Sequence, residues 1–265
     1  MLFRSIPVAI GGGDNMMGAI GTGNVRPGNM TMSLGTSGTV YAFSDEPIVD
    51  PKGNIAAFCA STGGWLPLLC TMNCTVTTEL MRNLLDTDLS SFEAAIASAP
   101  RGADGVLTLP FFNGERTPNL PDARGCILGL NSRNMKPANL LRSAVEGATY
   151  ALRFGIDELA GLGVDATEIV LTGGGMKSDK WRQLVADICN TPVTVYREDE
   201  GAALGAALQA LQLLESGSDV AELADANLTR DAERCCEPRS TAAKQYAESY
   251  QDYQQAVAAV TALYQ

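Results

Sequence analysis

Four glycine-rich turns, each placed after a short apolar segment, restrict the fold of this chain more than any other feature of its sequence. They occupy residues 11–13, 35–38, 63–64 and 173–175. Glycine accepts positive φ and lets a backbone approach a ligand closely, and the amide groups exposed in such a turn can bind anions. One such turn is usually only a turn. If two or more meet at one edge of a sheet, phosphate binding becomes the favoured interpretation.

The apolar segments between these turns predict strands first and then an alternation of helices and strands. Residues 30–34 pair with 39–43, and residues 55–60 pair with 65–70, as two hairpins. Further strands are predicted at 6–10, 106–112, 168–172 and 192–196, and helices at 15–20, 72–85, 91–99, 137–161, 178–189 and 202–214. This order predicts a layered α/β domain with a mixed sheet.

Three further segments complete the predicted outline. Residues 113–134 are expected to form a long ordered loop with a short strand near 126–130, and residues 216–240 carry the weakest pattern. The apolar helix at 202–214 is expected to be buried. We expect the last helix to pack on the domain through one apolar face, because about three heptads are few for a coiled coil. That face carries Tyr246, Tyr250, Tyr253, Val257, Val260 and Tyr264.

The composition argues against several kinds of function. The chain has 265 residues, with 19 Lys+Arg, 30 Asp+Glu and no His, so its formal charge is −11. This acidic balance argues against nucleic-acid or anionic-membrane partners, which need clustered basic residues. Without His, the chain contains neither a Ser-His-Asp triad nor a His-ligated metal site.

Cysteine usage and the N-terminal sequence point to a cytoplasmic protein. The seven cysteines are an odd number and form no C-x-x-C pair, so we expect buried reduced thiols rather than disulfides or a zinc site. No secretory signal pattern precedes the first glycine turn, and no uncharged apolar run of about 18 residues predicts a membrane span.

The glycine turns do not match the common nucleotide-binding or hydrolase motifs. Residues 173–178 read Gly-Gly-Gly-Met-Lys-Ser, which separates glycine from lysine where a Walker A loop joins them and lacks the last glycine of a G-x-G-x-x-G fingerprint. Residues 35–39 read Gly-Thr-Ser-Gly-Thr, which is not a G-x-S-x-G elbow. A P-loop NTPase, a dinucleotide-binding enzyme and an α/β-hydrolase are therefore disfavoured.

Asp14 stands out among the carboxylates because it follows three glycines and the predicted strand at 6–10. At a sheet edge it could accept a proton from a substrate hydroxyl or hold a metal ion through water. The simpler alternative, which the composition alone favours, is an N-cap for the helix that begins near Asn15.

Two pairs of opposite charges lie in the predicted loop. They are Glu115 with Arg116, and Asp122 with Arg124. The favoured interpretation is that salt bridges within these pairs fix the loop. Alternatively, Arg116 could reach toward an anion.

An ordered set of short segments then resembles a known family. The segments are residues 11–15, 18–23, 33–38, 113–118, 121–125, 129–130, 173–175 with 178, 181–183, 186–188 and 200–207. Each is weak alone, but the set covers nearly the whole chain. In this order the segments resemble the C-terminal half of the FGGY carbohydrate kinases, most of all the members that phosphorylate xylulose.

The resemblance implies an actin-like, ribonuclease H-like α/β domain, in which a mixed sheet flanked by helices forms one half of a two-domain kinase. Residues 1–265 would be the C-terminal, nucleotide-binding domain, and the N-terminal, sugar-binding domain would lie outside this chain. Asp14 is implied to be the general base on the sugar hydroxyl. The implied nucleotide-binding residues are Gly35, Thr36 and Ser37 at the phosphates, Gly173, Gly174, Gly175 and Ser178 on the adenosine side, and Thr75 and Glu79 after the second hairpin. No metal ligand is implied.

The activity implied by the resemblance is phosphorylation of a ketopentose by ATP with Mg²⁺, first of all D-xylulose to D-xylulose 5-phosphate. Another sugar or polyol is the alternative substrate. The alternative function is an isolated nucleotide-binding or interaction domain without activity. Because the sugar-binding half is not in the chain, we expect the chain alone to be inactive. We also expect the surface that would face that half to favour a homodimer.

Overall fold

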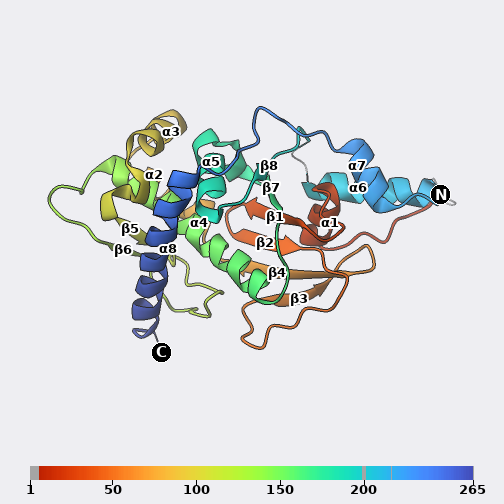
Figure 1. The fold of residues 1–265 in the computed structure, drawn as a ribbon, viewed down its shortest axis with the longest axis horizontal. Helices are drawn as coiled ribbons and strands as arrows, with labels where there is room; N and C mark the ends of the chain where they lie inside the picture. The colour runs from red at the N-terminus through yellow and green to blue at the C-terminus, as the bar shows by residue number, and fades with distance from the viewer. Residues whose placement is uncertain (1–5, 199–200, 216, 265) are drawn as a thin grey trace.

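The computed structural model describes residues 6–198, 201–215 and 217–264, which form a mixed sheet flanked by helices (Figure 1). The strands are β1 (Asn29–Leu34), β2 (Gly38–Ala42), β3 (Ala56–Cys59), β4 (Trp65–Thr71), β5 (Leu107–Leu109), β6 (Cys126–Leu128), β7 (Glu168–Thr172) and β8 (Val193–Thr194). The helices are α1 (Asp14–Gly21), α2 (Thr75–Leu84), α3 (Leu89–Ser98), α4 (Pro137–Gly161), α5 (Asp179–Cys189), α6 (Gly201–Leu214), α7 (Val220–Asn227) and α8 (Ser240–Thr261).

The main sheet has the strand order β3-β4-β2-β1-β7-β8. The first four strands pair with one another in antiparallel fashion and form the two predicted hairpins, whereas β7 runs parallel to both β1 and β8. Strands β5 and β6 form a separate two-stranded sheet. The predicted mixed α/β architecture is therefore confirmed. Since β1 and β7 are parallel neighbours, their carboxyl ends meet at one edge of the sheet.

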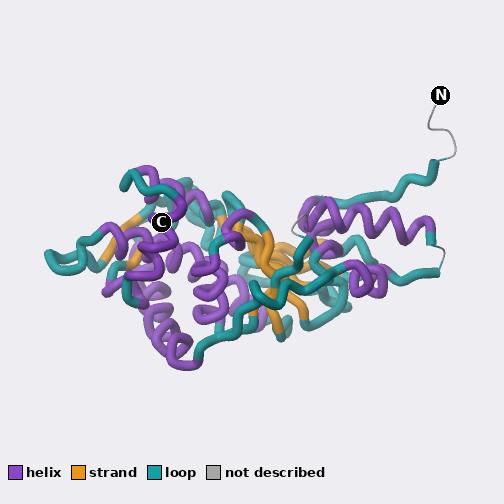
Figure 2. The backbone as a smooth tube through the Cα atoms, turned by 90° about the horizontal axis from the view of Figure 1, so that it is seen from above, coloured by secondary structure: helices purple, strands orange, loops and turns teal. Residues whose placement is uncertain are grey.

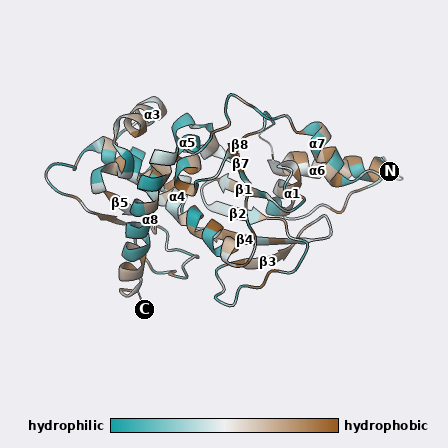
Figure 3. Cartoon of the chain, viewed as in Figure 1, coloured by the Kyte–Doolittle hydropathy of each residue, from teal (hydrophilic) through white to brown (hydrophobic). Residues whose placement is uncertain are grey.

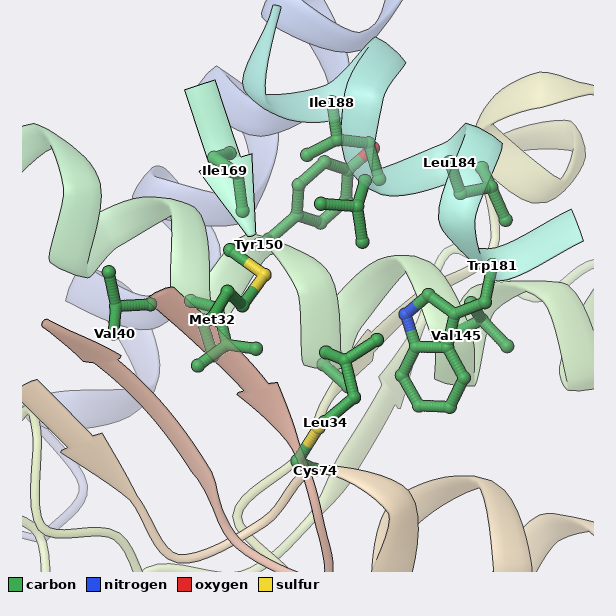
Figure 4. Close-up of a cluster of buried hydrophobic side chains, with 14 of the residues drawn as sticks. Met32, Leu34, Val40, Cys74, Val145, Tyr150, Ile169, Trp181, Leu184 and Ile188 are labelled. Carbon is green, nitrogen blue, oxygen red and sulfur yellow. The ribbon is translucent and has the colours of Figure 1, made fainter. Parts of the chain in front are cut away.

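Alternation along the strands divides the side chains between two covered faces. Met30, Met32 and Leu34 of β1 point to the face that α4 covers, and all three are fully buried. Figure 4 shows Met32 directed toward Tyr150 of α4 and Leu34 directed toward Trp181 of α5. Burial of an apolar side chain of this size contributes about 1.5–3 kcal/mol. This face holds the main core.

The opposite face of the sheet is covered by α1. Tyr41 of β2 packs with Ala19 of α1, and the hydroxyl oxygens of Thr22 and Thr31 lie 2.7 Å apart. The side-chain amide of Asn24 donates to the Tyr41 carbonyl over 2.9 Å. These contacts fix the end of α1 on the sheet, so they also set the direction in which its first residue points.

The last helix packs on the domain, as predicted. Tyr246, Tyr250 and Tyr253 of α8 are buried, and their rings lie 5.4–6.5 Å from the ring of Tyr150 in α4. Under this contact Arg142 donates to the Glu146 carboxylate over 2.7 Å. The tyrosine face thus closes the core on the side opposite α1.

The structure differs from the sequence-based outline near the N-terminus and in α6. Residues 6–13 form no strand, and Val8 and Ile10 are 83% and 100% exposed, so the predicted strand at 6–10 is wrong. The prediction that the apolar helix at 202–214 is buried is also wrong, because only Gly201, Gly205 and Leu208 of α6 are buried. Its apolar surface extends beyond the sheet with the N-terminal segment (Figures 2 and 3).

Two smaller predictions also need correction. Helix α7 lies in the stretch that carried the weakest pattern, where Asp219 caps the helix by accepting from the Ala221 amide. The cysteines are free thiols, but they are not uniformly buried, since Cys59 on the edge strand β3 is exposed. Among the described residues, no helix is long and apolar enough to cross a membrane.

Candidate functional site

The turn between β1 and β2 is held from behind by the start of α2. The backbone amides of Cys74 and Thr75 donate to the carbonyls of Thr36 and Gly35, each over 2.9 Å. These are amides that a helix start leaves without intrahelical partners. The side chains of Thr36 and Ser37 are exposed. Helix α2 therefore fixes the turn while its outer surface remains open.

The triple-glycine turn after β7 lies against this hairpin. Gly173 has φ +86°, and a Cβ atom on it would lie 2.8 Å from the carbonyl carbon of Leu34 and 3.1 Å from the amide nitrogen of Gly35. Only glycine fits such a backbone contact without a shift. Two glycine turns thus converge at one sheet edge, which is the arrangement that favours phosphate binding. The turn at 63–64 lies at the other end of β4, and residues 11–13 precede α1.

A pocket of about 460 Å³ opens beside these turns. It brings together five of the residues expected at the nucleotide, namely Thr75, Glu79, Gly174, Gly175 and Ser178. Ser178 also caps α5 as predicted, accepting from the Trp181 amide over 3.0 Å. Glu79 is exposed and pairs with Arg82 over 2.8 Å. Gly35, Thr36, Ser37 and Gly173 do not line the pocket but form the adjoining hairpin and turn.

The inner wall of this pocket was missed by sequence reasoning. It includes Phe92 of α3 and Trp181 of α5, which are 4% and 2% exposed, and the more exposed Leu89. The Trp181 indole donates to the Thr149 hydroxyl over 3.0 Å, which fixes its ring. Flat apolar surface beside polar groups suits a heterocyclic base. Trp181 lies within one of the matching family segments, whereas Phe92 carries no signal beyond its place on an amphipathic helix.

Asp14 is the first residue of α1, and the expectation that it caps this helix is wrong. The N-cap is Gly13, which makes no side-chain hydrogen bond, and Asp14 accepts from the adjacent Asn15 amide over 2.9 Å. Its carboxylate is exposed. The Thr39 hydroxyl, just beyond the hairpin turn, donates to the Asn15 side chain over 3.4 Å. This contact places the start of α1 beside the strand that leaves the phosphate-side turn.

Helix α1 is held by close backbone packing against α6. A Cβ on Gly205 would lie 1.8 Å from the Met17 carbonyl oxygen, and a Cβ on Gly21 would lie 1.7 Å from the Gly201 carbonyl oxygen. The Gln209 side chain of α6 also accepts from the Gly11 amide over 2.8 Å. These contacts depend on the absence of side chains, so α6 determines where α1 presents Asp14.

The loop carrying Glu115 and Arg116 is fixed by hydrogen bonds to Glu115 rather than by an ion pair between the two. The buried Glu115 carboxylate accepts from the Met72 amide over 2.6 Å, the Arg116 amide over 2.7 Å and the Asn73 side chain over 3.2 Å. Burial raises the pKa of Glu115, while these hydrogen bonds oppose the rise. The prediction of a salt bridge between Glu115 and Arg116 is therefore wrong, because the Glu115 carboxylate is bound by amide groups instead.

Arg116 and Asp14 lie in the same electrostatic neighbourhood. Burial raises the pKa of the Cys70 thiol, Arg116 lowers it, and Glu115 and Asp14 raise it further. Arg116 is exposed, so its guanidinium is available on the side of the sheet where Asp14 stands. In the second predicted pair, Arg124 is held through its backbone amide, which donates to the Tyr264 hydroxyl over 3.2 Å.

The comparisons with known proteins identify the family of this chain. The profile of the "FGGY family of carbohydrate kinases, C-terminal domain" matches residues 30–213. A xylulose kinase of Haemophilus influenzae is 45% identical over 250 residues, which are 94% of this chain and 50% of that protein. A xylulose kinase of Streptomyces rubiginosus is 42% identical over 82% of this chain and 43% of its own length.

Solved structures show the same correspondence. The ligand-bound xylulose kinase from Lactobacillus acidophilus superposes with a TM-score of 0.88 at 26% identity, covering 94% of this chain and 50% of that one. The xylulose kinase from Bifidobacterium adolescentis gives 0.79 at 35% identity, covering 93% and 49%. The chain therefore spans about half the length of the relatives it matches.

Proposed function

The chain belongs to the FGGY family of carbohydrate kinases, and we propose that it supplies the nucleotide-binding half and the catalytic base of an ATP-dependent kinase for D-xylulose. The observation that carries this proposal is the convergence of the two glycine turns beside a pocket with an apolar wall. The names of the relatives support the choice of sugar. Another ketopentose or polyol is the alternative substrate.

In this proposal one group of residues binds the nucleotide, and Asp14 accepts the proton. The adenosine lies in the pocket against Gly174, Gly175 and Trp181, and the phosphates lie along the hairpin at Gly35, Thr36 and Ser37. The exposed carboxylate of Asp14 takes the proton from the terminal sugar hydroxyl as it attacks the γ-phosphate. Catalysis of this reaction consists mainly of positioning and of stabilising charge on the transferring group.

Mg²⁺ enters the proposal as the ion that accompanies the nucleotide. Such ions are held by the substrate's phosphates together with one or two carboxylates. The exposed Asp14 carboxylate is one oxygen donor of the right kind on this side of the sheet. When bound, the ion would neutralise charge on the phosphates.

The competing function is nucleotide binding without catalysis. It is favoured by the contrast between a lined pocket and a base that is exposed to solvent. A reaction in which water competes with the sugar needs the base to be enclosed. The chain alone is therefore expected to bind nucleotide without transferring phosphate to a sugar.

The test is reconstitution with the missing half. This chain would be joined to the N-terminal half of the Haemophilus influenzae xylulose kinase, and ADP release would be measured with D-xylulose and other ketopentoses. Xylulose-dependent turnover is expected from the joined protein and not from the chain alone. Turnover at a typical kinase rate by the chain alone, or a folded joined protein that binds ADP but acts on no ketopentose, would contradict the proposal.

We also propose that the chain alone self-associates through its exposed apolar end. Val8 and Ile10 of the N-terminal segment and Leu214 of α6 are 83%, 100% and 67% exposed. Clustered exposed apolar residues favour association. Light scattering is expected to show dimers at high concentration that disappear when these three positions are changed to Ser. A monomer at all concentrations would contradict this.

A further inference from the structure

A second and larger cleft, of about 970 Å³, lies on the other side of α5 from the candidate nucleotide pocket. Its lining residues come from helices α3, α4, α5 and α8, from the segment that follows α3 and from the segment that precedes α8. Figure 1 shows how these helices are arranged. Its size falls in the range of small-molecule sites. None of the segments that match the kinase family accounts for a ligand here.

The charge of this cleft is opposite to that of the whole chain. Six of the 19 Lys and Arg residues line it, against two carboxylates, Asp179 and Glu233, so the lining carries 6 − 2 = +4 in a chain of net charge −11. The six are Arg101, Arg142, Lys180, Arg182, Arg234 and Arg239. Such a concentration of one sign in a concave surface attracts ligands of the other sign.

Two of these cations form ion pairs with buried carboxylates outside the cleft lining. The Arg142 guanidinium bonds the buried Glu146 carboxylate over 2.7 Å, and Arg239 pairs with the buried Asp187 carboxylate. Neither acid lines the cleft. Arg142 also donates to the carbonyls of Ile96 and Ala99, so it serves the fold rather than a ligand.

The other four cations keep donor capacity toward the cleft. Arg101 bonds only the neutral Gln245 side chain, over 3.1 Å, and Arg234 lies 3.8 Å from Asp231, which is long for a hydrogen bond. Lys180 is exposed at the mouth. Lys180 and Arg182 lie on α5, whereas Arg101 and Arg234 come from two other segments, so cations from three parts of the chain can contact one group. Counting Asp231 with the two lining carboxylates leaves four cations against three acids.

Arg182 is the buried member of this set. It is 4% exposed, and it donates to the carbonyl oxygens of Arg234 over 3.0 Å and Met176 over 2.7 Å and to the Asp179 carboxylate over 2.5 Å. Five donors on a guanidinium exceed these three bonds. The cleft therefore has a buried, hydrogen-bonded cation as well as more exposed cations.

We propose that this cleft binds a small anion that carries a phosphate group. Guanidinium groups match the oxygens of a phosphate in pairs, and a dianion gains more than a monoanion from several surrounding cations. The concave shape favours a small molecule over a polymer. The chemistry fits inorganic phosphate and a sugar phosphate alike, so the experiment compares these two sources.

Two thiols inside the cleft provide a local readout. Cys235 and Cys236 line it, whereas Cys59 lies on the exposed edge strand β3 and serves as an internal reference. The whole chain would be treated with iodoacetamide, with potassium phosphate, glucose 6-phosphate, or potassium chloride at matched ionic strength. Alkylation of each thiol would be followed by mass spectrometry. This readout separates the cleft from the nucleotide pocket, where phosphate could also bind.

We expect phosphate or glucose 6-phosphate at millimolar concentration to slow alkylation of Cys235 and Cys236 at least about threefold, while Cys59 is unaffected. The stronger of the two probes identifies the source. Arg101→Gln, which removes a lining cation far in sequence from the thiols, should lower the affinity for the protecting ligand at least about tenfold. Arg133→Gln removes the same charge from an exposed loop outside the cleft and should change nothing. Equal protection by chloride, no protection by either phosphate, or equal ligand affinity in both variants would overturn the proposal.

Discussion

The two parts of the candidate kinase site are built in opposite ways. The nucleotide side rests on the core: α2 amides bond the hairpin carbonyls, Gly173 touches the backbone of β1, and Trp181 is buried. The base side consists of an exposed carboxylate at the start of an eight-residue helix. That helix packs against α6, whose opposite surface is apolar and exposed to solvent. From this difference we expect the chain to bind nucleotide by itself and to need a further covering element for catalysis.

The largest expected contrast between the two sides is in thiol reactivity. Burial raises the pKa of Cys74, which lies under the nucleotide-side hairpin, to about 12. Against an ordinary thiol with a pKa near 9, the thiolate fraction at neutral pH is about a thousandfold lower, because each pKa unit is a factor of ten.

Pulse alkylation followed by mass spectrometry measures this contrast. Cys59 should react first, and the half-buried Cys70 beside Asp14 should react before Cys74. Rapid labelling of Cys74 in the folded chain would show that the hairpin is not anchored on the core.

The second prediction separates catalysis from nucleotide binding. In the joined protein, Asp14→Asn should lower kcat at least about a hundredfold, which is the usual contribution of a general base, and leave ADP affinity within about twofold. Asp252→Asn on the exposed side of α8 lies outside the family-matching segments, so it is the matched control and should retain activity. Near-normal kcat in Asp14→Asn would show that Asp14 is not the general base.

The third prediction concerns the support of the base side. Gly205→Val would place a side chain against the Met17 carbonyl oxygen, so it should lower the free energy of unfolding by about 1–3 kcal/mol. Ala206→Val on the exposed side of the same helix should cost less. Urea titration of the chain measures both. If the two variants are equally stable, the close contact between α1 and α6 is not what holds the base.

The sequence predicted best those features of the fold that depend on residues close together in the chain. β7 matches its predicted bounds, α4 begins at Pro137 as predicted, and Ser178 caps α5, because period, proline and cap signals act within a few residues. The strand at 6–10 failed because an apolar run becomes a strand only with a partner. In this structure Ile10 has none and is fully exposed.

Within the site, the limits are set by contacts between distant segments. The glycine turns could be found from composition, but their meeting depends on the parallel pairing of β1 with β7, which no local signal gives. Phe92 reaches the pocket from α3 for the same reason. The sequence also does not indicate which glycine of the triple-glycine turn adopts positive φ; in the structure it is Gly173, with φ +86°.

The central claim is that the nucleotide binds at the triple-glycine turn, and its most direct test is a substitution of Gly174. A Cβ on Gly174 would meet no atom within 4 Å, so Gly174→Val should leave the fold intact and fill space at the pocket. Calorimetric titration of this chain with ADP, paired with a thermal melt, measures both effects. We predict one ADP site, a loss of affinity of at least about tenfold, or 1.4 kcal/mol, in the variant, and an unchanged Tm. Unchanged ADP affinity in a folded Gly174→Val protein, or no ADP binding by the unmodified chain, would contradict the account.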